Sequence, residues 1–305
     1  MPETIDRIPV SGSPEPEPWL RRLHPAAFVV FALGVIFILY QVVGGGAALL
    51  IAGGRITPDT VPLVRWSTLL GQILLMLVPT LLLTRLRFGS VVQPLRLHLP
   101  RPVDLFLTVI ALLALQQVLQ GYMVLQDAIP LPSKFQQLVD MLKELFEETY
   151  RMLVFAQSPG EFFFVVVTVA LVPAVCEELL FRGLVQHDLE SAVGGVRSAI
   201  FTGAIFGLFH LNPLSIVPLI ALGVFFGFLV YHSQNITLAM AAHFLNNFLA
   251  CVALYFQVDE DFMVITSLGT AGAGAVAANT AVFALVFLGV MYYFVDISGR
   301  RLPAS

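Results

Sequence analysis

The stretch EFFFVVVTVALVPAVCEELLFRG, residues 161–183, decides the fold of this chain. Between Glu161 and Glu177 it carries no charged residue. The run is long enough to cross the hydrocarbon core of a bilayer, which takes about 20 helical residues. The same stretch then carries Glu177, Glu178 and Arg182, which are costly to bury in lipid. It therefore predicts a membrane-spanning helix that holds ionisable groups.

The composition of the whole chain places it among integral membrane proteins. Hydrophobic residues make up 58% of the sequence and charged residues 12%, whereas soluble domains are about a quarter charged. The net charge of −4 and the lack of a Lys/Arg block exclude a nucleic-acid-binding protein, and two cysteines exclude a disulfide scaffold. Continuous apolar runs, in place of the short alternating strands of a β-barrel, predict helices.

We predict an all-α, polytopic membrane bundle of about eight transmembrane helices. The predicted spans are residues 26–44, 66–84, 103–124, 161–183, 196–212, 214–232, 235–256 and 274–296. Lys and Arg mark the cytoplasmic side of membrane proteins. Eleven of the sixteen lie on one side, in the N-terminal tail, in the connections that follow the second and fourth spans, and at the C-terminal end. Both termini are therefore expected in the cytoplasm.

The chain divides into five predicted parts. Residues 1–22, rich in Pro and acidic residues, are expected to be a disordered tail, and residues 23–132 hold the first three spans. Residues 133–158 have apolar side chains at helical spacing with charges on the other faces, which predicts an amphipathic connecting helix at the outer surface. A partner-binding helix is the alternative. Residues 159–258 hold four spans, and residues 259–305 hold the last span and a basic C-terminal end.

Three clusters of polar residues lie inside the predicted spans: Glu177-Glu178…Arg182, Phe206…His210 and His243…Asn247. An ionisable group at the centre of a span costs about 2.5–3.5 kcal/mol, so it is retained only if it is paired or used. Glu178 and Arg182 are four residues apart and can pair on one helix face, which leaves Glu177 on another. His243 and Asn247 also share a face. With a rise of about 1.5 Å per residue, Glu177 and His243 reach similar depths in the cytoplasmic half of the membrane.

These residue types suit peptide hydrolysis. A buried Glu beside a His takes a proton from water when its pKa is tuned towards neutral, while His and Asn donate hydrogen bonds to the carbonyl oxygen as charge develops. A Glu and two His are alternatively a zinc ligand set. Buried Glu and His also serve as proton relays in transporters.

Together and in this order, the clusters resemble the signature motifs of the CAAX-protease and bacteriocin-processing (CPBP, or Abi) family of intramembrane endopeptidases, which includes the type II CAAX prenyl protease. The family patterns are Glu-Glu-x-x-x-Arg, Phe-x-x-x-His and His-x-x-x-Asn, and all three are complete here. The resemblance covers about residues 160–256, which makes residues 159–258 a CPBP-like catalytic core.

The resemblance implies an eight-span fold whose site opens to the cytoplasm and cleaves a membrane-associated or lipidated peptide near its C-terminus. In eukaryotic members the substrate is a prenylated protein with a CAAX box, which loses its last three residues. Carried over to this sequence, the resemblance makes Glu177 the general base and His210 the residue that positions water. His243 and Asn247 would form the oxyanion hole, while Glu178 and Arg182 would shape the site and balance its charge.

Several alternatives stay open at this point. We expect a metal-independent protease, with zinc held by Glu177, His210 and His243 as the alternative. A proton-coupled transporter and a non-catalytic immunity or scaffold protein are the other classes. The expected partners are the lipid bilayer and a peptide or prenylated protein, and no nucleic acid. The expected location is a bacterial inner membrane, or the endoplasmic reticulum if the chain is eukaryotic.

A polar stripe of Gln116, Gln117 and Gln120 lies in the third predicted span. Glutamines in membrane helices usually hydrogen-bond to a neighbouring helix. The alternative is that they line a substrate cavity.

Overall fold

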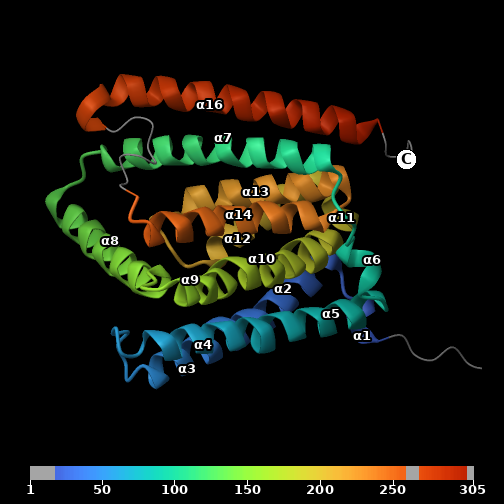
Figure 1. The fold of residues 1–305 in the computed structure, drawn as a ribbon. Coiled ribbons are helices and arrows are strands. Elements are labelled where there is room, and N and C mark those ends of the chain that lie inside the picture. Colours follow the sequence, from blue (N-terminus) through green and yellow to red (C-terminus); the bar gives the residue numbers. More distant parts are fainter. Residues whose placement is uncertain (1–17, 259–267, 301–305) are drawn as a thin grey trace, which may run out of the picture.

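The computed structural model of the chain describes residues 18–258 and 268–300. These residues are mostly helical, and the described ranges contain no strand (Figure 1). Residues 1–17, which are most of the predicted tail, lie outside the described part. So do residues 259–267 and the end of the predicted basic C-terminus, residues 301–305.

The N-terminal half forms three long apolar helices, two of which contain a π-helical segment. Its elements are α1 (Trp19–Arg22), α2 (Pro25–Phe37), η1 (Ile38–Gly44), α3 (Gly45–Ile51), α4 (Val61–Gly71), η2 (Gln72–Leu77), α5 (Val78–Phe88), α6 (Val92–Leu95) and α7 (Pro102–Asp127). The short α1 was expected to be part of the tail. It is ordered because Leu20 is buried and because Arg87 donates hydrogen bonds to the carbonyls of Leu20 and Leu23, at 2.5 and 2.9 Å.

The C-terminal half carries the three motif clusters. Its elements are α8 (Ser133–Val154), α9 (Pro159–Val165), η3 (Val166–Leu171), α10 (Val172–Glu178), η4 (Leu179–Gln186), α11 (His187–Val193), α12 (Gly195–Phe209), α13 (Ile216–Ser233), α14 (Ile236–Tyr255) and α16 (Leu268–Gly299). The elements from α9 to α11 form one continuous helix that runs ten residues beyond the predicted end at residue 183.

Seven helices in the described part are long and apolar enough to cross a membrane, which confirms the predicted all-α polytopic membrane bundle. They are Pro25–Ile51, Val61–Phe88, Pro102–Asp127, Pro159–Val193, Ile216–Ser233, Ile236–Tyr255 and Gly272–Gly299. The predicted span 196–212 corresponds to α12, which has only 15 residues. It ends before His210 because Leu211 has a left-handed backbone (φ 53°) and Pro213 follows.

The helices pack in layers around α12, α13 and α14 (Figure 1). On one side α7 packs against α16, and on the opposite side lie α2 to α5. Helix α8 crosses one end of the bundle and joins α7 to α9. The motif-bearing helices α10, α12 and α14 are therefore enclosed between two flanking layers.

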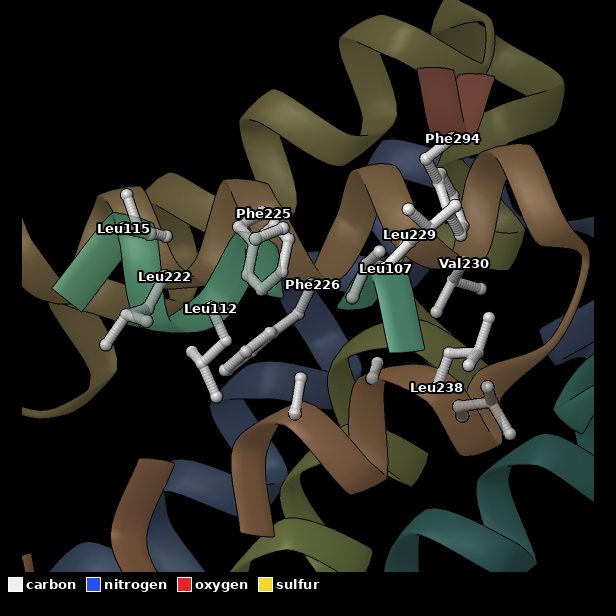
Figure 2. Packing of buried hydrophobic residues seen from close by; sticks show 14 of the residues in the cluster. Leu107, Leu112, Leu115, Leu222, Phe225, Phe226, Leu229, Val230, Leu238 and Phe294 are labelled. Atoms are coloured by element: carbon white, nitrogen blue, oxygen red, sulfur yellow. The ribbon is translucent and has the colours of Figure 1, made fainter. Parts of the chain in front are cut away.

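The hydrophobic core next to the motifs lies between α7, α13 and α14 (Figure 2). Leu112 of α7 and Leu229 of α13 are fully buried in it, and Phe294 of α16 packs against this core from the neighbouring layer. Phe226 belongs to the same core and is 1% exposed. Its ring also stacks on His243 of α14, so the core holds one of the motif residues in place.

Glycines allow α12 and α13 to approach closely. A Cβ atom added to Gly203 of α12 would lie 2.4 Å from the backbone nitrogen of Val224, and one added to Gly223 of α13 would lie 2.8 Å from the carbonyl oxygen of Gly203. Small residues at such crossings let helix backbones pack together in membranes. The contact sets the position of α13, and therefore of Phe226, relative to the motif helices.

We expect Gly203→Ala to lower the free energy of unfolding by about 1–3 kcal/mol, because the added methyl group overpacks a backbone contact. Thermal unfolding of the purified protein in detergent measures the change. Gly289→Ala on α16 is the matched control, since a Cβ atom there meets nothing within 4 Å. Equal melting temperatures for Gly203→Ala and the wild type would contradict this account of the α12–α13 contact.

Candidate active site

Two neighbouring carboxylates lie at the end of α10, where the helix passes from α-helical to π-helical geometry. The π-helical segments η3 and η4 flank α10 on both sides, and such segments are frequent at functional sites. All eight residues of η4 are buried. Glu177 and Glu178 therefore sit on a deeply packed helix, and they point to different surroundings.

Glu178 lies at the centre of a buried chain of charged groups. Its Oε1 atom accepts a hydrogen bond from Nη1 of Arg182 at 3.0 Å and contacts Nδ1 of His243 at 2.9 Å. The side chains of Glu178 and Arg182 are 0% exposed and that of His243 is 5% exposed. The pairing of Glu178 with Arg182, predicted from their spacing, is present. It compensates two charges that would each be costly to bury alone.

Aromatic rings and one carbonyl complete the surroundings of this chain. The guanidinium of Arg182 lies 4.9 Å from the ring centroid of Phe206 and 5.4 Å from that of Phe226, distances at which cation–π attraction operates. Nη2 of Arg182 donates to the carbonyl of Gly223 at 2.7 Å. The ring of Phe226 stacks on His243 at 5.3 Å with an interplanar angle of 17°. The orientation of the His243 imidazole is thus fixed on one edge by Glu178 and on one face by Phe226.

Glu177 faces a different histidine. Its Oε2 atom lies 3.6 Å from Nε2 of His210, which occupies the C-terminal cap of α12. Nδ1 of His210 lies 2.7 Å from the carbonyl oxygen of Phe206, and because a carbonyl only accepts hydrogen bonds, Nδ1 carries the proton. In the neutral imidazole Nε2 then presents a lone pair towards Glu177. One water molecule can donate its two hydrogens to these two acceptors and keep its oxygen lone pairs free.

Asn247 is held by hydrogen bonds at both ends of its amide. Its Nδ2 atom donates to the carbonyl of Val169 in η3 at 3.0 Å, and its Oδ1 atom accepts from Nδ2 of Asn246 at 3.1 Å. Oδ1 of Asn246 in turn accepts from Nε2 of Gln116 in α7 at 3.3 Å. An amide NH₂ group has two hydrogens, so Asn247 keeps one N–H for a ligand.

The predicted site residues thus form a chain of three, Arg182–Glu178–His243, and a pair, Glu177–His210, while Asn247 bonds to Val169 and Asn246. Phe206 lies between the two histidines. The ring of Phe206 lies 4.6 Å from that of His210 and 5.8 Å from that of His243. Glu177 contacts His210, whereas His243 contacts Glu178. The sequence predicted His243 as a site residue but did not predict its partner. Spacing within one helix does not reveal which carboxylate faces a residue of another helix.

Four groups around the site were not among the predicted site residues: Phe226, Asn246, Gln116 and the carbonyl of Val169. Gln116 had a signal, because it belongs to the polar stripe in an otherwise apolar span. Asn246 stands next to a motif residue. No sequence pattern indicated Phe226 or Val169, since an aromatic ring and a backbone carbonyl are ordinary parts of any membrane helix.

The three residues of the alternative zinc site do not converge on one point in this arrangement. Within residues 18–258 and 268–300, no group of three or more His, Cys, Asp or Glu is placed to hold a metal ion. Glu177 and His210 face each other, whereas His243 faces the neighbouring carboxylate, Glu178. The three residues as placed therefore do not form a three-ligand zinc site.

Comparison with known proteins finds one family to which this region is similar. Residues 159–249 match the family described as type II CAAX prenyl endopeptidase Rce1-like. The match contains all three motif clusters. No curated protein and no solved structure matches the chain.

Removing Arg182 should destabilise the protein strongly, because Glu178 then loses its cationic partner in a fully buried site and keeps only its contact with His243. We expect Arg182→Ala to cost about 3–5 kcal/mol of unfolding free energy. Arg300→Ala is the matched control: Arg300 also pairs with a carboxylate four residues away, Asp296, but its side chain is 75% exposed. That change should cost less than about 1 kcal/mol. Chemical denaturation in detergent, followed by tryptophan fluorescence, compares the two, and similar losses would contradict the central role given to the buried pair.

Proposed function

We propose that this chain, whose residues 159–249 carry a type II CAAX prenyl endopeptidase Rce1-like domain, is an intramembrane endopeptidase that cleaves a membrane-associated or lipidated peptide near its C-terminus. The family supports a CAAX-type intramembrane protease in general terms. One observation carries the specific proposal. A carboxylate and an imidazole, Glu177 and His210, face each other at 3.6 Å on helices of a membrane bundle, so that one water lying beside the pair can contact both.

The water is activated by these two residues. Glu177 takes a proton from the water while His210 holds it in place, and the water oxygen forms a bond to the carbonyl carbon of the scissile peptide. The electron pair of the carbonyl moves onto its oxygen. When this tetrahedral intermediate collapses, the carbon–nitrogen bond breaks and the protonated Glu177 returns the proton to the leaving amine. The carboxylate is then regenerated for the next cycle.

The negative oxygen of the intermediate needs hydrogen-bond donors, and we assign this role to Asn247 and His243. Asn247 has one free N–H beside its bond to Val169. His243 is held at Nδ1 by Glu178, and its Nε2 atom donates when it carries a proton. Glu178 and Arg182 thus act as positioning and charge-balancing residues. The Oε2 atom of Glu177 is buried and has no hydrogen-bond partner among the described residues, and the same holds for Oε2 of Glu178 and Nε of Arg182.

The partners proposed for this activity are the lipid bilayer and a peptide or prenylated protein. The long apolar helices establish an integral membrane protein. We propose a bacterial inner membrane as its location, with the endoplasmic reticulum as the eukaryotic equivalent. The distribution of lysines and arginines supports an orientation in which both termini face the cytoplasm.

We expect Glu177→Gln to lower kcat for a fluorogenic farnesylated CAAX peptide by at least about 100-fold, because the amide cannot accept the proton of water. Purified protein in detergent is assayed beside Glu144→Gln, a control that removes an exposed carboxylate of α8 and should leave kcat unchanged. His210→Ala should lower kcat to a similar extent as Glu177→Gln. Undiminished turnover in a folded Glu177→Gln protein would remove Glu177 from the mechanism. No cleavage by a folded wild type would favour a non-catalytic or transport role.

We expect a zinc chelator to leave this peptidase activity unchanged, because the proposed water is held by protein side chains alone. The assay is repeated after prolonged dialysis against a chelator, and metal content is measured by mass spectrometry on the same sample. Loss of activity that zinc restores would favour the alternative with Glu177, His210 and His243 as ligands.

A further inference from the structure

A cavity of about 540 Å³ lies between α7, α13 and α14, beside the candidate active site. Part of its lining is polar, although the cavity lies among membrane-spanning helices. The polar lining comprises Gln116, Gln117, Gln120, Ser215 and Asn246. The rest of the lining is apolar and includes Leu113, Leu119, Met123 and Leu249, the first three of which belong to α7, as the glutamines do. The predicted alternative that the glutamine stripe lines a cavity is therefore seen in the structure, and Gln116 also makes the interhelical hydrogen bond.

The cavity is connected to the proposed oxyanion donor by direct hydrogen bonds. Gln116 donates to Asn246 at 3.3 Å, and Asn246 donates to Asn247 at 3.1 Å. Both Gln116 and Asn246 line the cavity, whereas Asn247 faces the site. A molecule in the cavity would therefore lie one side chain away from the atoms proposed to bind the scissile carbonyl.

The other two glutamines have unused hydrogen-bonding groups. Within residues 18–258 and 268–300, Gln117 and Gln120 make no hydrogen bond. Each amide offers two donor hydrogens and an acceptor oxygen. In a membrane interior such groups gain much from a polar partner, because lipid supplies none. A prenyl chain would leave them unsatisfied, whereas the alternating C=O and N–H groups of a peptide match both halves of a glutamine amide.

We propose that this cavity binds an extended segment of the peptide substrate, with Gln117 and Gln120 hydrogen-bonding to its backbone amides and the apolar lining receiving its side chains. The volume agrees with this occupant, since pockets of about 300–1,000 Å³ hold ligands the size of a short peptide. The proposal rests on the proposed function, because it names where that substrate lies. Recognition through backbone amides also predicts tolerance of different side chains in this segment.

Steady-state kinetics test the role of the glutamines. We expect Gln117→Leu and Gln120→Leu each to raise KM for a farnesylated CAAX peptide about 2–10-fold, the range of one or two lost hydrogen bonds, with kcat nearly unchanged. Gln137→Leu is the control, because it makes the same change at an exposed position of α8 that does not line the cavity. Unchanged KM in both glutamine variants would overturn the proposal, as would an equal rise of KM in Gln137→Leu.

Photocrosslinking tests the location without relying on catalysis. In the Glu177→Gln background, Leu119→benzoylphenylalanine places the probe in the cavity, and Leu285→benzoylphenylalanine places it on the surface of α16, where Leu285 is 71% exposed. We expect a fluorescent farnesylated CAAX peptide to crosslink at position 119, in competition with unlabelled peptide, and not at position 285.

The two proposals fail in distinguishable ways. Cleavage by the wild type without a competed crosslink at position 119 would overturn the cavity assignment alone, leaving lipid or water as the occupant. A competed crosslink in a protein whose wild type cleaves nothing would keep the peptide site and overturn the peptidase. If the wild type cleaves nothing and no competed crosslink forms at position 119, both the peptidase and the peptide site are overturned.

Discussion

The buried chain of Arg182, Glu178 and His243 is the interaction on which the rest of the structure depends. A single charge in the low-dielectric interior of a membrane protein is costly, so each member requires the others. The chain links α10 to α14 through the contact of Glu178 with His243, and η4, which continues α10, to α13 through the bond of Arg182 to Gly223. Three helices are therefore held in one register by charges that cannot separate without exposing one of them to lipid.

Close helix packing makes this register possible. Arg182 and Gln186, one helical turn apart on η4, donate to the carbonyls of Gly223 and Gly227, one turn apart on α13, at 2.7 and 3.0 Å. A Cβ atom on Gly227 would lie 2.9 Å from Oε1 of Gln186, so the absence of a side chain lets the donor reach the backbone. The same approach brings Phe226 onto the face of His243. Packing and polar contacts thus specify the same geometry.

Two adjacent carboxylates have different surroundings. Glu178 is fully buried and contacts both Arg182 and His243. Glu177 is 13% exposed and lies opposite the imidazole of His210. The proposed function assigns them different roles, charge balance for Glu178 and acid–base chemistry for Glu177. Such a division of environments between neighbouring acids is how one fold assigns charge-balancing and acid–base roles.

The sequence by itself determined the class of the protein, the helical nature of its membrane spans and the Glu178–Arg182 pair, because these depend on composition and on spacing within one helix. It also pointed to the Glu177, His210, His243 and Asn247 clusters. Only the tertiary structure decided that His243 faces Glu178 and that His210 faces Glu177, because these contacts depend on the rotation of separate helices about their axes. The same holds for the cavity behind Asn246, since a stripe of glutamines on one helix lines a hollow only when the helices opposite leave it open.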